Sequence, residues 1–212
     1  MKTGQVVPEY RQIADVVPEG SRRIARVEHF DISKDEAEFH NLRCAINSRR
    51  LGMTHFVRPG RYARLYVNGQ LMMSDTPMEQ ATSREAVELA RGRVLIAGLG
   101  LGLIVLPILA KPDVESVTVV EKFADVVRLV SPAVRRAAGT DAGKLVVERA
   151  DIWRWKPEMR RFDFAYLDIW PTINSDDYGE HVALRRKVRR YLRGNGVVRS
   201  WEFETLRDLR QR

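Results

Sequence analysis

RVLIAGLGLG, residues 93–102, is the stretch that decides the fold of this chain. Its first half is apolar, which predicts a short buried strand. Gly98, Gly100 and Gly102 predict a sharp turn, because a residue without Cβ lets the backbone bend and approach a ligand closely. A helix expected from about residue 102 adds free N–H groups and partial positive charge. These glycines, with Leu99 between the first two, form a Gly-x-Gly-x-Gly turn. Its place between a strand and a helix predicts an adenosyl-cofactor site. The alternative is a tight turn that binds no ligand.

The pattern on both sides of this turn alternates between strands and helices. Short apolar segments predict strands at 93–97, 116–121, 144–148, 162–168 and 197–201. Helical patterns fall between them at about 102–110, 123–137 and 179–193. Alternation of this kind predicts a parallel sheet with helices on its faces.

Acidic residues follow two of the expected strands. Glu121 ends the second strand, nineteen residues after the last glycine, and is followed by Lys122. A carboxylate at this strand end reaches the ribose hydroxyls of an adenosine. Asp151, with Ile152 beside it, follows the third strand, where adenosyl-binding sheets meet the adenine amino group. The alternatives are a helix-capping acid at Glu121 and a purely local role for Asp151.

The spacing of the glycines argues against a nicotinamide dinucleotide. Those cofactors use Gly-x-Gly-x-x-Gly and a second βαβαβ half. Here the third glycine comes one residue early, and no second half follows. The sequence therefore favours a cofactor of the S-adenosylmethionine type.

The part before this sheet predicts an arm, a helix and a hairpin. Residues 22–31 favour a strand, and Ser33 with Glu36 forms a capping-box signature for a helix that ends near Arg50. Asn68-Gly69 predicts a type I′ turn within a hairpin at 61–73. A further helix is expected to begin at Pro77 and to end near residue 91. We expect residues 1–76 to form an N-terminal unit and residues 77–212 the cofactor-binding domain.

Composition narrows the class of protein. The chain has 212 residues, 44% of them hydrophobic, and one cysteine, Cys44. A lone cysteine suits a reducing compartment, and the polar start lacks a secretory h-region, so we expect a cytoplasmic protein. No apolar run approaches the ~20 residues of a membrane span. No His/Cys/Asp cluster has metal-ligand spacing, so no metal is expected.

The chain is basic, with a net charge of +8 and a pI of about 9.9. Much of the excess lies within residues 185–193, where apolar residues also recur at helical spacing. The favoured interpretation is an amphipathic helix with a solvated basic face. A nucleic-acid footprint is the alternative, although no zinc spacing or aromatic RNA-binding motif accompanies it.

Residues 62–170 resemble the spermidine-synthase-like branch of the S-adenosylmethionine-dependent methyltransferase superfamily. The resemblance rests on the hairpin with Asn68-Gly69-Gln70, the acids Asp75 and Glu79, and the strand that enters the glycine turn. Residues 39–201 more closely resemble uncharacterised methyltransferase-like proteins of phages and bacteria. The shared motifs there are Met73-Ser74-Asp75-Thr76-Pro77, the glycine turn, Glu121, Asp168-Ile169-Trp170 and Ser200-Trp201.

This resemblance implies a fold and a cofactor. The fold is α/β, with a Rossmann-like class I methyltransferase sheet that is mostly parallel and stops after its fifth strand. The cofactor is S-adenosyl-L-methionine. Many methyltransferases carry an acid two residues before the first glycine, facing the cofactor's amino group, but Ile96 stands there. We expect Asp75 to take that role.

The resemblance also places the chemistry at the end of the fourth strand. Asp168 is the expected catalytic residue, which orients or deprotonates the acceptor, with contact to the cofactor or local backbone as alternatives. Trp170 is expected to stack on the acceptor or lie against the sulfonium, with packing as the alternative. Tyr66 and His55 are weaker candidates for closing the pocket. Pro171 replaces the second acid of the aminopropyltransferase motif Asp-x-x-Asp-Pro, which argues against polyamine synthesis.

The sequence thus favours a methyltransferase acting on a small-molecule or unknown acceptor. An aminopropyltransferase and a cofactor-binding protein with little transfer activity are the alternatives. A sheet that stops at its fifth strand leaves an edge, which segment 22–31 or a second copy of the chain would cover. Related proteins pair through their N-terminal hairpins, so a homodimer is expected.

Overall fold

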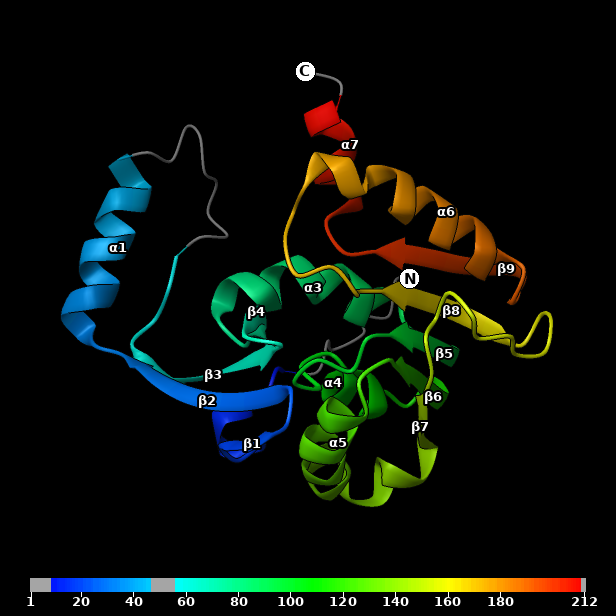
Figure 1. The fold of residues 1–212 in the computed structure, drawn as a ribbon, viewed down its shortest axis with the longest axis horizontal. Coiled ribbons are helices and arrows are strands. Elements are labelled where there is room, and N and C mark those ends of the chain that lie inside the picture. Colours follow the sequence, from blue (N-terminus) through cyan, green and yellow to red (C-terminus); the bar gives the residue numbers. More distant parts are fainter. Residues whose placement is uncertain (1–8, 47–55, 211–212) are drawn as a thin grey trace, which may run out of the picture.

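The computed structural model describes residues 9–46 and 56–210, which form two sheets (Figure 1). The larger sheet is parallel throughout, with the strand order β7-β6-β5-β8-β9. Its strands are β5 (Gly92–Ala97), β6 (Val114–Glu121), β7 (Leu145–Arg149), β8 (Phe162–Leu167) and β9 (Leu192–Ser200). Numbered along the chain, this order is 3-2-1-4-5, which is Rossmann-like. The predicted α/β fold is confirmed.

Helices cover both faces of this sheet because its central strand is apolar on both sides. Val94 and Ile96 of β5 belong to the core cluster that includes α4 (Val105–Leu109) and α5 (Ala124–Ala138). Leu95 and Ala97, which point the other way, pack in a second cluster with α6 (Tyr178–Arg189). Helix α3 (Pro77–Leu89) joins the first cluster, and α7 (Phe203–Arg210) follows β9.

The smaller sheet is antiparallel, with the order β1-β2-β3-β4. Its strands are β1 (Gly20–Arg22), β2 (Ala25–Ile32), β3 (Gly60–Val67) and β4 (Gln70–Ser74). Asn68 (φ 51°) and Gly69 (φ 77°) make the tight turn that the sequence predicts. The capping box is also present, because the Ser33 amide donates to Glu36 Oε2 (2.8 Å) and the Glu36 amide to Ser33 Oγ (3.2 Å). It begins α1 (Lys34–Ile46), which stands away from both sheets in Figure 1.

One core joins the two sheets. Val27 and Leu65 of the small sheet lie in the same buried cluster as Ile96 and Val130 of the Rossmann-like part. Ile13, in the short 3₁₀ turn η1 (Ile13–Asp15), is also buried there. This packing holds the hairpin, whose Leu65 and Val67 line the cavity described below, against the Rossmann-like part.

Three details differ from the sequence-based expectation. Strand β9 begins at Leu192, so residues 194–196 lie inside the strand instead of in a turn before it. Helix α4 begins only at Val105, because the glycine turn continues through residue 104. Segment 22–31, one of the two possible covers for the edge of the parallel sheet, instead contributes to β2, which pairs with β3.

The helix end expected near Arg50 and the candidate His55 lie outside the described residues. Within residues 9–46 and 56–210, no helix combines the length and the apolar character that a membrane crossing requires.

Candidate functional site

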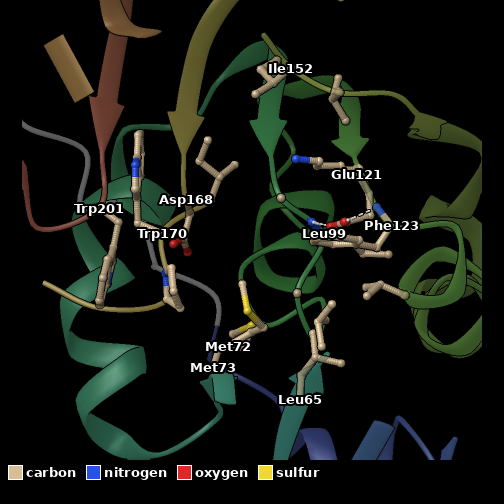
Figure 2. A pocket seen from close by; sticks show the side chains of 18 of the residues that line it. Leu65, Met72, Met73, Leu99, Glu121, Phe123, Ile152, Asp168, Trp170 and Trp201 are labelled. Carbon is tan, nitrogen blue, oxygen red and sulfur yellow. Dashed lines mark hydrogen bonds between the residues drawn. The ribbon is translucent and has the colours of Figure 1, made fainter. Parts of the chain in front are cut away.

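A cavity of about 470 Å³ lies at the carboxyl ends of the parallel strands. The glycine turn and the ends of β6 and β8 form its floor and sides, and Met72 and Met73 of β4 reach over it. Figure 2 shows two sides of this cavity. One carries Leu99, Glu121 and Phe123; the other carries Asp168, Trp170 and Trp201.

Left-handed backbone explains the glycines of the turn. Gly98, Gly100 and Gly102 have φ angles of 96°, 52° and 78°. A Cβ on Gly98 would collide with the backbone oxygen of Asp168, and one on Gly100 with the sulfur of Met73. Gly98 and Gly100 line the cavity, as expected.

Gly102 does not line the cavity, which differs from its expected contact with the cofactor. A Cβ there would run into the side chain of Val134 on α5. A glycine is therefore needed at position 102 so that the turn can pack against α5.

Glu121 ties the turn to the next strand end. Its Oε2 accepts from the Leu99 amide (2.8 Å) and its Oε1 from the Phe123 amide (2.8 Å). Burial raises the pKa of this carboxyl, and the surrounding backbone N–H groups pull the pKa back down. A carboxylate offers about four lone-pair sites, so each oxygen keeps acceptor capacity for a hydroxyl in the cavity.

The next strand end supplies the rest of this side. Asp151 lines the cavity, with Oδ1 accepting from the Trp153 amide (2.9 Å) and Oδ2 lying 3.8 Å from Lys122 Nζ. Ile152 is buried and adds an apolar surface. The structure thus brings Lys122, Asp151 and Ile152 into the same cavity as the glycine turn and Glu121.

Two carboxyls with raised pKa values occupy the other side. Asp168 follows β8, and its amide donates to the Ala97 oxygen (2.9 Å). Burial, followed by the nearby charge of Glu79, raises the pKa of Asp168 to about 8. Burial, followed by the charge of Glu202, raises the pKa of Glu79 to about 7. Both groups therefore exchange protons near neutral pH.

Carboxylates outnumber cations around the whole cavity. Its described lining contains Glu79, Glu121, Asp151, Asp168 and Glu180, against a single cation, Lys122. Such a cavity attracts a cationic ligand and repels a pyrophosphate.

Indole rings are fixed beside Asp168. Trp170 stacks on His181, with ring centroids 3.4 Å apart at 15°, and its Nε1 donates to Glu180 Oε2 (3.3 Å). His181 Nδ1 lies 2.7 Å from Ser200 Oγ, and burial, with the charge of Arg185, lowers the pKa of His181 to about 4. The imidazole is therefore neutral at pH 7, and it presents a flat uncharged surface that orients Trp170.

Asp75, expected to meet the cofactor's amino group, lies elsewhere. It is fully buried, with Oδ2 accepting from the Ile13 amide (2.9 Å) and Oδ1 from the Ala63 amide (2.7 Å). It does not line the cavity. Both oxygens hold η1 against β3, so the expectation is corrected to a role in the fold.

Tyr66 also lies off the cavity. Its ring lies under the guanidinium groups of Arg26 and Arg64, at 4.8 and 5.4 Å from the ring centroid. The pocket-closing role is therefore not supported for Tyr66.

Sequence reasoning missed several residues that the structure places in the lining: Met72, Met73, Ser83 and Trp201. Trp201 Nε1 donates to Thr82 Oγ1 of α3 (3.2 Å). The motif Ser200-Trp201 carried the only signal for it. In the part of the chain that the structure describes, no group of three or more His, Cys, Asp or Glu residues could hold a metal ion.

No protein-family model matches the chain, and a search of curated proteins gives no match. Solved structures with a similar trace include spermidine synthase from Thermotoga maritima (TM-score 0.48, 15% identity, 87% of this chain and 56% of that one). They also include the CcbJ methyltransferase from Streptomyces caelestis (TM-score 0.44, 19% identity, 57% of this chain and 47% of that one). The chain spans about half the length of these two proteins.

Proposed function

We propose that this chain binds S-adenosylmethionine in the cavity and transfers its methyl group to an acceptor that loses a proton to Asp168. One observation carries the proposal. A single cavity joins an adenosine-type side, with the glycine turn and Glu121, to a side where two carboxyls titrate near neutral pH.

The residues present fit this cofactor. S-adenosylmethionine supplies an electrophilic methyl group on a cationic sulfonium. A lining of five acidic side chains, of which Glu79 and Asp168 are partly protonated near neutral pH, and one lysine suits that positive charge. The free acceptor sites of Glu121 would receive the ribose hydroxyls, Asp151 the adenine amino group, and Ile152 would cover the adenine ring. Gly98 and Gly100 line the cavity, and without Cβ atoms they let the turn pack directly against the Asp168 oxygen and the Met73 sulfur.

Asp168 is suited to take a proton. A general base works best when its pKa lies near the working pH, and the pKa of Asp168 is about 8. Its side chain shares one face of the cavity with Trp170 (Figure 2). Trp170 would hold the acceptor against Asp168, so that an N–H or O–H proton moves to the carboxylate as the nucleophile bonds to the methyl carbon, whose bond to sulfur breaks to leave the neutral thioether product.

Aminopropyl transfer is the second candidate. The carboxyls of Glu79 and Asp168 would also suit a cationic amine, whose charge would favour their ionised forms. Pro171 lines the cavity in place of the second acid of that motif, so methyl transfer is favoured.

A labelling experiment tests the proposal. Wild-type protein and Asp168→Asn would each be incubated with S-adenosylmethionine carrying a tritiated methyl group and with fractionated cell extract. We expect label in one fraction with wild type and none with Asp168→Asn, at equal cofactor affinity by calorimetry. Equal labelling by both proteins, or none by either, would contradict the proposal.

A further inference from the structure

A basic surface adjoins the cavity and is not used by the proposed reaction. It is formed by α6 and by the connection at 150–161, which together cover one face of the parallel sheet. We call it the basic face; its members are Arg154, Lys156, Arg160, Arg161, Arg186 and Arg190. All of them are exposed except Arg161, which is half-buried.

Hydrogen bonds hold the two segments side by side. Lys187 Nζ donates to the Trp155 oxygen (2.6 Å), and the Arg160 amide to the Arg190 oxygen (3.4 Å). The Arg161 amide donates to the Tyr191 oxygen (2.8 Å). Residues of the connection are therefore fixed beside the last turn of α6.

The cations of the basic face lack acidic partners. Among residues 9–46 and 56–210, none of the six makes a salt bridge within 4.0 Å. Nearby arginines are paired, as in Arg193 with Asp163 and Arg199 with Glu85, both at 3.0 Å. On these adjoining segments the unpaired cations outnumber the exposed acids, Glu158 and Glu180, and so create a positive potential that favours a polyanion.

One end of the basic face reaches the mouth of the cavity, because the connection 150–161 runs from the carboxyl end of β7 to the amino end of β8. Trp153 lines the cavity, yet 39% of it is exposed, and it directly precedes Arg154. An exposed indole next to unpaired cations offers stacking for a base beside contacts for phosphates, the two elements of single-strand binding. The acidic cavity would admit an uncharged base and keep phosphates outside.

We propose that the basic face binds single-stranded nucleic acid and presents one of its nucleotides to the cavity as the methyl acceptor. The phosphates lie along α6 and the 150–161 connection, and a base stacks on Trp153 at the mouth. This inference rests on the proposed function only in naming the acceptor; binding by the basic face stands apart from transfer.

The test compares two matched double variants. Arg186→Gln/Arg190→Gln removes two charges from the basic face, one helical turn apart. The control Arg135→Gln/Arg136→Gln removes two exposed charges from α5, which packs on the opposite face of the sheet. Anisotropy of a labelled single-stranded oligonucleotide would be recorded across a salt series. Duplex DNA and anionic lipid vesicles serve as competitors.

Wild type is expected to bind the single strand. Loss of two phosphate contacts should weaken binding about tenfold or more at 0.1 M salt and make the log–log salt slope about 1.4 shallower. The affinity of the control variant for the oligonucleotide should fall by less than about threefold. Trp153→Ala should weaken binding of the single strand at least about fivefold and leave the duplex unaffected.

Three results would overturn the inference. Wild type does not bind the oligonucleotide, or the control variant loses as much affinity as Arg186→Gln/Arg190→Gln. The third is that lipid vesicles displace the labelled oligonucleotide while unlabelled nucleic acid does not. Calorimetry with S-adenosylmethionine on the same proteins separates the two proposals. If the protein binds the single strand but not the cofactor, the proposal for the basic face stands and the proposed methyl transfer is contradicted.

Discussion

Glu121 should hold the glycine turn even when no cofactor is bound. Glu121→Ala removes the acceptor for the Leu99 and Phe123 amides, each bonded at 2.8 Å. Hydrogen bonds to a charged group contribute about 1.5–3 kcal/mol each. Burial of the carboxylate, which raises its pKa, offsets part of that sum, so we expect a net loss of about 2–4 kcal/mol. For a chain of this size, that corresponds to a fall in Tm of about 4–16 °C.

Thermal unfolding followed by circular dichroism, without cofactor, measures this loss. Glu115→Ala is the matched control, because Glu115 lies on the same strand but is exposed, 3.4 Å from Arg93. An exposed pair of this kind contributes about 0–1 kcal/mol. A Tm for Glu121→Ala that equals the Tm of the control would refute the reasoning that the carboxylate ties the turn.

Three further predictions concern pH, cofactor choice and assembly. Because the fold raises the pKa of Asp168 to about 8, its contribution to stability is present below the usual carboxyl pKa of about 4 and is lost as pH rises through 8. The Tm of Asp168→Asn should therefore rise relative to the Tm of wild type as pH increases from about 4 to 8. A Tm difference that stays constant over this pH range would contradict the raised pKa of Asp168. With Pro171 in place of an acid, decarboxylated S-adenosylmethionine and putrescine should yield no spermidine. Detection of spermidine by mass spectrometry would favour aminopropyl transfer over methyl transfer. Among the described residues no strand pairs with the outer edge of β9, so this edge and the hairpin at 61–73 predict a homodimer; light scattering at micromolar concentration that gives only a 24 kDa species would exclude it.

Local patterns were enough to predict the parallel sheet and the adenosine side of the cavity. The glycine turn and Glu121 belong to one strand–turn–helix unit and the next strand, so sequence spacing fixes their proximity. Asn68-Gly69 likewise specified its turn, because both residues accept positive φ. The extent of β9 was less predictable, since Leu192 already pairs with Phe162 and residues 193–196 bulge out of the ladder before Val197 pairs with Phe164.

Long-range packing determined what the sequence could not reveal. The role of Asp75 depends on amides that lie 62 and 12 residues away along the chain, at Ile13 and Ala63. The raised pKa of Glu79 depends on burial and on Glu202 beyond β9. The basic face depends on the connection 150–161 lying against α6, which periodicity alone does not predict.

Calorimetry of wild type and Glu121→Gln with S-adenosylmethionine tests the central claim most directly. The demethylated product and the decarboxylated cofactor would be titrated in parallel. The side-chain amide of the variant offers one acceptor oxygen in place of two, so its affinity should fall roughly ten- to a hundredfold, while wild type should bind the cofactor and its demethylated product. No heat of binding with wild type, or equal affinity for the two proteins, would contradict an adenosyl-cofactor site at the glycine turn and Glu121.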